Sequence, residues 1–159
     1  MINASAKSYG KLWKLDNWVT IIKYLKNKYN NCYFFSTGTL EESNIYDYLA
    51  HKTGVNFHNL CGKTSIRETI AFYRHLDLVI TVDSAPAHFA AIADAKNIII
   101  IYGPTNQQQW LPQSNNSKIY QVYLNLSCRP CFTRSCYGQK CLQDLKPENI
   151  IKIIDKINI

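Results

Sequence analysis

The sequence predicts an α/β fold in which a parallel β-sheet is covered by helices on both faces. Short apolar runs alternate along the chain with segments whose apolar residues recur at helical spacing. One stretch shows the repeating unit in full, because the apolar run 78–82 is followed by Asp83 and then by Pro86 at the first turn of a small-residue helix. Strands that alternate with helices in this way pair in parallel, since each helix returns the chain to the same edge of the sheet.

The first sixty residues predict two strands and two helices. Asp16 can cap a helix that runs through Leu25, and the apolar run 32–35 is typical of a strand. After a glycine-containing turn, two glutamates open a second expected helix, 41–52, and a short strand is expected at 57–60.

The remainder of the chain predicts three more strands and three more helices. Ser65 and Glu68 have the spacing of a capping box at the start of one helix, and Ala85 begins the next. Residues 105–117 are rich in Asn, Gln and Ser and predict a surface loop. A closing helix is expected at about 147–158, where isoleucines recur at helical spacing. The expected strands are 78–82, 98–102 and 118–124.

Composition favours one globular unit over residues 1–159. The chain is 47% apolar and 18% charged, which leaves enough apolar material for a core. No apolar run approaches the ~20 residues of a membrane span, and the first residues lack the pattern of a signal peptide, so the expected location is the cytoplasm. The net charge of +7 favours acidic partners such as a nucleotide diphosphate, a phosphorylated glycolipid, an anionic membrane leaflet or nucleic acid, although it can also serve solubility alone.

The turn after the strand 78–82 is the best candidate for a binding site. The backbone N–H groups of Ser84 and Ala85 stand at the start of a helix, where anions bind. Asp83 can accept hydrogen bonds from sugar hydroxyls, and His88 lies one turn further along the helix. The alternative is structural, with Asp83 as a helix cap and His88 facing the core.

Several motifs occur in one order along the chain: Gly-Lys-Thr-Ser-Ile at 62–66, Asp-Ser-Ala-Pro-Ala-His at 83–88, Gly-Pro-Thr at 103–105 and Trp-Leu-Pro at 110–112. With Asn-Ala-Ser-Ala-Lys at 3–7 and Lys-Leu-Trp at 11–13, this series resembles the donor-binding half of glycosyltransferase family 9, the ADP-heptose:lipopolysaccharide heptosyltransferases. Ala85 stands where that family has glycine, and its methyl group restricts the close approach of a phosphate.

The resemblance implies a Rossmann-like domain, the C-terminal half of a GT-B glycosyltransferase that transfers heptose from ADP-heptose to the lipopolysaccharide inner core. The acceptor site and the catalytic carboxylate belong to the family's N-terminal domain. We therefore expect an N-terminally truncated half with no catalytic residue of its own, inactive in transfer without a separately encoded N-terminal half. The resemblance also implies inverting displacement without a catalytic cofactor, and allows peripheral association with the inner membrane.

The resemblance implies a role for Lys11, and the convergence of four loops at the carboxyl edge of the sheet predicts roles for the other residues; ordinary solvated charges and a plain strand-ending turn are the alternatives. Lys11 aligns with the lysine that contacts the donor phosphates, and Lys7 is the alternative. Either Glu41 or Glu42 accepts from the ribose hydroxyls. Asp83 and His88 face the sugar or the leaving diphosphate, and the pocket floor is shaped by Gly103 and Thr105.

Four cysteines gather in a loop, 128–141, near the end of the chain: Cys128, Cys131, Cys136 and Cys141. Close cysteines in an intracellular chain favour a metal, and four thiolates would satisfy a structural zinc. Free, partly buried thiols are the alternative.

Two other readings compete with an active transferase half. One is an inactive or split nucleotide-binding module. The other is a basic, zinc-bearing nucleic-acid-binding protein, which is less favoured because the aromatic residues lie mostly within apolar runs and no nucleic-acid motif appears.

Overall fold

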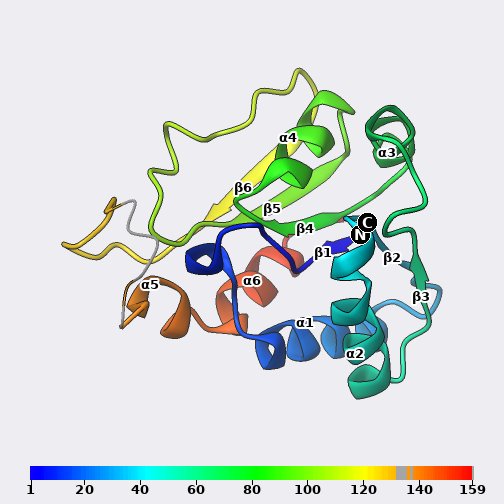
Figure 1. Cartoon of the computed structure of the whole chain (residues 1–159), viewed down its shortest axis with the longest axis horizontal. Coiled ribbons are helices and arrows are strands. Elements are labelled where there is room, and N and C mark those ends of the chain that lie inside the picture. The colour runs from blue at the N-terminus through cyan, green and yellow to red at the C-terminus, as the bar shows by residue number, and fades with distance from the viewer. Residues whose placement is uncertain (132–135, 137, 159) are drawn as a thin grey trace.

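The computed structural model describes residues 1–131, 136 and 138–158, and it has the predicted parallel sheet with helices on both faces (Figure 1). The main sheet has four parallel strands in the order β1-β4-β5-β6. A second parallel sheet consists of two strands, β2 and β3. The strands are β1 (Ile2–Asn3), β2 (Phe34–Ser36), β3 (Phe57–Asn59), β4 (Val79–Val82), β5 (Asn97–Ile101) and β6 (Lys118–Val122).

The two sheets continue one another, because β1 lies beside β2. The resulting spatial order, β3-β2-β1-β4-β5-β6, is that of a doubly wound sheet whose direction of winding reverses between β1 and β4. Ligands of such sheets bind outside the carboxyl ends of the strands near that reversal. The order therefore places the loops after β1, β2 and β4 together.

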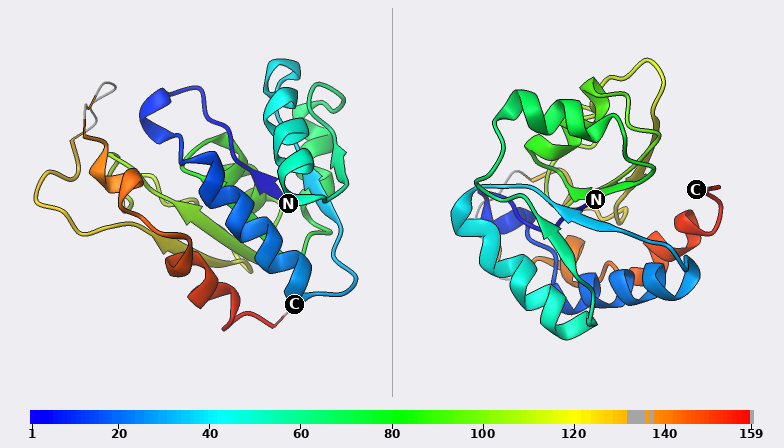
Figure 2. Two further views of the ribbon diagram at one scale, coloured as in Figure 1. Left: turned by 90° about the horizontal axis from the view of Figure 1, so that it is seen from below. Right: turned by 90° about the vertical axis from the view of Figure 1, so that its right-hand side faces the viewer.

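The helices form a layer on each face of the sheet (Figure 2). On one face, α1 packs against both α2 and α6. On the other face, α3 packs against α4. The helices are α1 (Leu15–Lys28), α2 (Ser43–Thr53), α3 (Ile66–Tyr73), α4 (Ala85–Ile92), α5 (Lys140–Gln143) and α6 (Pro147–Ile154), with 3-10 turns η1 (Tyr9–Lys11) and η2 (Leu40–Glu42).

Strand β5 divides its side chains between the two helical layers. Ile99 and Ile101 belong to the core beneath α1, α2 and α6, whereas Ile98 and Ile100 belong to the core beneath α3 and α4. All four side chains are fully buried. This explains the unbroken apolar run in the sequence, since a strand covered on both faces has no polar side.

Several predicted helix starts can be checked against the structure. The capping box is confirmed: Ser65 N donates to Glu68 Oε2 at 2.8 Å, Glu68 N donates to Ser65 Oγ at 3.3 Å, and α3 begins at the next residue. The cap predicted at Asp16 was wrong, because Lys14 is the N-cap of α1 and Asp16 lies in the first turn. A carboxylate in the first turn still stabilises the positive end of the helix dipole.

Three expected boundaries differ by a few residues. The helix expected from residue 41 begins as the 3-10 turn η2, and α2 follows from Ser43. Strand β6 ends at Val122, and α6 ends at Ile154, although Ile157 beyond it is still buried in the core. Among the described residues, no helix combines the length and apolarity that crossing a membrane requires.

Candidate functional site

A cavity of about 490 Å³ opens at the carboxyl edge of the sheet, beside the ends of β1, β2 and β4. The chain reaches it from four directions: the loop after β1, the turn after β2, the start of α3 and the start of α4. Its lining residues are Ser5, Ala6, Lys7, Ser8, Lys11, Thr37, Gly38, Thr39, Glu42, Thr64, Ile66, Thr69, Ser84, Ala85, Pro86 and Phe89. Of the predicted donor residues, Lys11, Glu42, Ser84 and Ala85 are among them.

The strongest electrostatic feature of this edge is an ion pair between Lys11 and Asp83. Lys11 Nζ lies 2.9 Å from Asp83 Oδ2, and the lysine side chain is 24% exposed whereas the aspartate side chain is 4% exposed. Thr105 Oγ1 donates to the same carboxylate oxygen at 2.5 Å. Lys11 Nζ also stands 5.8 Å from the ring centre of Trp110. The buried carboxylate thus fixes the position of an ammonium that remains accessible from the cavity.

The side chain of Asp83 is bound by residues of the chain itself, and its contact with a sugar stays a prediction. Its main-chain N–H donates to Ile101 at 3.0 Å, and its side chain is occupied by Lys11 and Thr105.

The start of α4 contributes main-chain donors. Ser84 is the N-cap in an extended conformation, and its hydroxyl donates to the carbonyl of Val82 at 3.3 Å instead of capping the helix. The N–H groups at the start of a helix have no acceptor within the helix, so Ser84 and Ala85 offer donors to an anion at the cavity. Pro86 has no N–H to offer and suits the first turn.

The two candidate glutamates are separated by the geometry. Glu42 Oε2 accepts from Thr39 N at 2.8 Å and lines the cavity. Glu41 is exposed and is not among the lining residues; a hydrogen bond from Thr39, its largest influence, lowers its pKa. Both acids sit in one 3-10 turn, so the sequence alone gave no basis for choosing.

Two further predicted residues are not among those that line the cavity. His88 is half-buried on α4, where Ala85, Pro86 and Phe89 are the lining residues. Gly103 is buried, and a Cβ there would come within 2.9 Å of Leu142 Cδ1 and 3.2 Å of the carbonyl oxygen of Gly10. Gly103 thus permits close packing of three segments, and Thr105 touches the site through Asp83.

Sequence reasoning missed the polar floor formed by Asn3, Thr37 and Tyr73. Tyr73 OH donates to Asn3 Oδ1 at 2.9 Å and lies 2.6 Å from Thr37 Oγ1. Burial raises the pKa of Tyr73 to about 12. The three residues come from β1, the turn after β2 and the end of α3, and such a meeting depends on the fold and not on local spacing.

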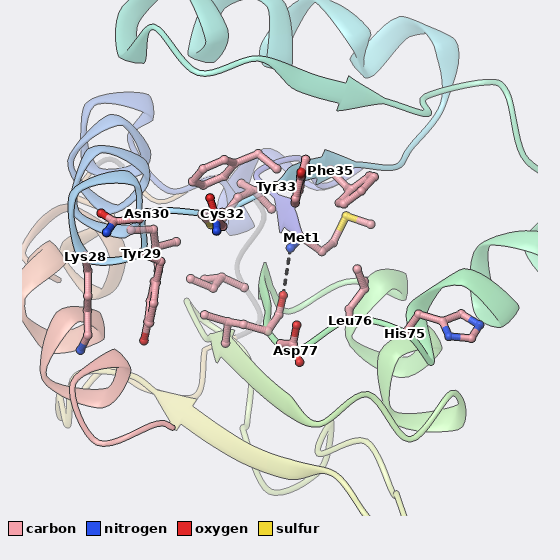
Figure 3. Close-up of a pocket in the computed structure, with 16 residues that line it drawn as sticks. Met1, Lys28, Tyr29, Asn30, Cys32, Tyr33, Phe35, His75, Leu76 and Asp77 are labelled. Atoms are coloured by element: carbon pink, nitrogen blue, oxygen red, sulfur yellow. Dashed lines mark hydrogen bonds between the residues drawn. The ribbon is translucent and has the colours of Figure 1, made fainter. Parts of the chain in front are cut away.

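A larger cavity, of about 670 Å³, lies at the opposite edge of the sheet, near the amino ends of β1, β2 and β4 (Figure 3). Apolar and aromatic side chains make up most of its wall. The N-terminal ammonium of Met1 donates a hydrogen bond to the carbonyl oxygen of Leu78 at 2.9 Å. Lys28 lines this larger cavity, and its Nζ forms an ion pair with Asp155 Oδ1 at 2.6 Å. It contains none of the predicted donor residues, and the chemistry of anion binding favours the smaller cavity.

The cysteines do not assemble as a structural zinc site would require. Cys128, Cys131 and Cys136 are exposed, Cys141 is buried on α5, and all four border a hollow of about 30 Å³. Within 1–131, 136 and 138–158, no three His, Cys, Asp or Glu side chains are grouped to hold a metal ion. The zinc prediction thus gains no support.

Comparison with known proteins relates this geometry to a family. Residues 1–142 match glycosyltransferase family 9 (heptosyltransferase). The chain is 36% identical over 130 residues to lipooligosaccharide heptosyltransferase 2 of Campylobacter jejuni subsp. jejuni serotype O:6. The aligned region covers 78% of this chain and 40% of that protein. It is 26% identical over 159 residues to lipopolysaccharide heptosyltransferase 3 of Escherichia coli strain K12, covering 99% of this chain and 45% of that protein.

Solved structures show the same fold. The glycosyl transferase family 9 protein from Veillonella parvula DSM 2008 superimposes with a TM-score of 0.78 at 18% identity, over 98% of this chain and 44% of that one. E. coli heptosyltransferase WaaC with ADP superimposes with a TM-score of 0.73 at 18% identity, over 99% of this chain and 43% of that one. The chain thus spans less than half the length of these relatives, and over that span it belongs to glycosyltransferase family 9.

Proposed function

We propose that residues 1–159 form the donor-binding half of a heptosyltransferase, which holds ADP-heptose while heptose is transferred to the lipopolysaccharide inner core. The observation that carries this proposal is the accessible Lys11 ammonium, held by buried Asp83 beside the start of α4 at the carboxyl edge of the sheet. A fixed cation and free main-chain donors at one cavity suit a diphosphate. The names of the curated relatives support heptose as the sugar.

In this proposal the diphosphate lies between Lys11 and the N–H groups of Ser84 and Ala85. Lys7 also lines the cavity and is exposed, so it supplies a second cation at the mouth. Glu42, at the far side of the turn after β2, accepts from the ribose hydroxyls, as acidic residues do in other nucleotide-binding folds. Asp83 acts by orienting Lys11, and His88, which is not among the residues that line the cavity, has no direct contact with the diphosphate in this proposal.

The chemistry of this half is stabilisation of a leaving group. As the bond between the anomeric carbon and the diphosphate breaks, negative charge grows on the diphosphate oxygens. Lys11 and the start of α4 are already in place to balance that charge, an electrostatic contribution that requires no proton transfer from this chain. An acceptor hydroxyl is deprotonated by a carboxylate of an acceptor-binding half, either separately encoded or joined to this one.

The proposed site of action is the cytoplasmic face of the inner membrane, with the chain as a peripheral protein. The net charge of +7 would draw it towards anionic lipid and phosphorylated glycolipid. A nucleic-acid role has no corresponding feature at the cavity, which is a concave pocket and not an open basic groove.

Titration calorimetry of the purified chain with ADP and with adenosine tests the proposal. We expect weak ADP binding, much weaker adenosine binding, and no heptose transfer by the chain alone. Transfer should appear when an acceptor-binding half of the family is added with ADP-heptose and a lipopolysaccharide acceptor. A folded chain that binds neither ADP nor ADP-heptose would overturn the donor-site assignment.

A further inference from the structure

We propose that Arg129, in the cysteine-rich segment, is a positioning residue of the donor site that holds Lys11 in place through the loop 103–105. The inference deepens the proposed function and rests on it, because it assumes that Lys11 binds the donor diphosphate. It also gives the cysteine-rich segment a role that requires no metal.

The segment around Arg129 binds three consecutive carbonyl groups of the loop. Arg129 Nε donates to Gly103 at 2.5 Å, and Arg129 Nη2 donates to Thr105 at 3.1 Å. Between them, Cys131 N donates to Pro104 at 3.0 Å. The whole main chain of the loop is thus fixed from one side by two residues of the cysteine-rich segment.

Arg129 is itself held in a defined orientation. Its Nη1 donates to the carbonyl of Leu124 at 2.8 Å, and its guanidinium lies over the ring of Tyr123 at 4.9 Å. A planar group with donors along three edges can bind three carbonyls at once, which a lysine ammonium cannot do in the same geometry. The contacts therefore depend on arginine specifically.

The loop is connected to the donor cavity by one continuous set of contacts. Thr105 Oγ1 donates to Asp83 Oδ2 at 2.5 Å, and the same oxygen pairs with Lys11 Nζ at 2.9 Å. Asp83 and Thr105 are buried, so the carboxylate has no water to replace a lost partner. If the loop moves, Asp83 loses its second donor and Lys11 loses the fixed oxygen that aims it at the cavity.

Two pairs of variants distinguish positioning from general support of the fold. Arg129→Ala removes the hydrogen bonds to the carbonyl groups, and Arg129→Lys keeps the positive charge without the planar set of N–H donors. Thr105→Val removes the hydroxyl at nearly constant volume, whereas Thr105→Ser retains it. Arg74→Ala, at an exposed arginine that ends α3, is the matched control.

The first measurement is affinity for ADP and adenosine, alongside thermal unfolding. We expect Arg129→Ala, Arg129→Lys and Thr105→Val to weaken ADP binding about tenfold, as for contacts within one network, and adenosine binding less than twofold. Thr105→Ser and Arg74→Ala should bind as the parent does. Adding Arg129→Ala to Lys11→Ala should cause little further loss of ADP affinity, because Arg129 acts on the diphosphate through Lys11. Equal loss for ADP and adenosine, or full additivity with Lys11→Ala, would overturn the proposal.

The second measurement needs no nucleotide. Acetylation of Lys11 by acetic anhydride, followed by mass spectrometry, reports how firmly its ammonium is held by Asp83. We expect Arg129→Ala and Thr105→Val to acetylate Lys11 several-fold faster, with exposed Lys23 unchanged. An unchanged rate at Lys11 would refute the positioning role. If the parent fails to bind ADP while Lys11 still responds, the donor assignment fails and the structural link stands.

Discussion

Asn3 and Thr37 join the two sheets through a side chain. Asn3 Nδ2 donates to the carbonyl of Thr37 at 2.9 Å and to its hydroxyl at 3.1 Å. Tyr73 OH then bridges the two residues by contacting Asn3 Oδ1 and Thr37 Oγ1. Each polar atom of this small network is buried and has a partner, so the network fixes the relative position of β1 and β2 next to the cavity that Thr37 lines.

The ionisation of Tyr73 should make the fold sensitive to alkali. Burial is the main cause that raises its pKa from 10.0 to about 12. Above pH 10 the unfolded chain loses this proton first, so the stabilising effect of neutral Tyr73 is complete below pH 10 and is lost as the pH rises to about 12. Two pKa units correspond to about 2–3 kcal/mol. Urea unfolding of the parent and Tyr73→Phe between pH 8 and 11 measures the effect, and equal slopes for both would contradict it.

The ion pair at the cavity should respond unequally to loss of its two members. Lys11→Ala leaves the buried Asp83 carboxylate with Thr105 alone, and we expect a loss of about 3 kcal/mol in the free energy of unfolding. Asp83→Ala leaves an ammonium that can turn to solvent, so its electrostatic cost should be smaller. Chemical unfolding of both variants and of the double variant tests this, since the double variant should be more stable than Lys11→Ala. A double variant less stable than either single variant would rule out the unpaired carboxylate as the cause.

Lys11 and Lys7 should contribute differently to binding of the diphosphate. Because Lys11 is held in place by Asp83 and Lys7 is exposed, we expect Lys11→Ala to weaken ADP binding by ~1.5–3 kcal/mol and Lys7→Ala by less than ~1 kcal/mol. Adenosine, which has no phosphate, should be bound almost equally by the parent and both variants. Calorimetric titration provides the comparison, and a greater loss in Lys7→Ala would move the phosphate site to the loop after β1.

Gly103→Ala tests the packing behind the cavity. The added methyl group would meet Leu142 and the carbonyl of Gly10, neither of which is free to move far in a buried contact. We expect destabilisation of about 1–3 kcal/mol, the usual cost of overpacking. Gly138→Ala is the matched control, since its nearest contact would be Lys140 Cγ at 3.7 Å. Thermal unfolding of the two variants should differ clearly, and equal melting temperatures would show that the loop adapts.

The layers of the fold were predictable because most of the strands and helices have a local pattern of their own. The run of isoleucines in β5, the capping box before α3 and the proline turn before α4 all lie within a few residues of sequence. The short β1 and the 3-10 turn η2 were not, since both depend on contacts with distant segments and carry little periodicity.

The cavity at the carboxyl edge of the sheet was predictable in its location and less so in its details. Residues such as Lys11, Ser84 and Ala85 reach the cavity because parallel strands bring their carboxyl ends to one edge. Asp83 accepts a hydrogen bond from Thr105, which is 22 residues away along the chain and lies in the loop after β5. No local spacing predicts such a partner. The contacts of Arg129 were missed for the same reason, because its acceptors are main-chain carbonyl groups, which leave no mark on the sequence.

The division of β5 between the two cores has a consequence for how the protein opens. Its side chains alternate between layers, and its main chain is hydrogen-bonded to β4 on one side and β6 on the other. Neither helical layer can detach without exposing isoleucines of this strand, so local fluctuations should leave its amides protected. Amide hydrogen exchange in β5 should then proceed only through complete unfolding, and its slowest rates would report the stability of the whole molecule.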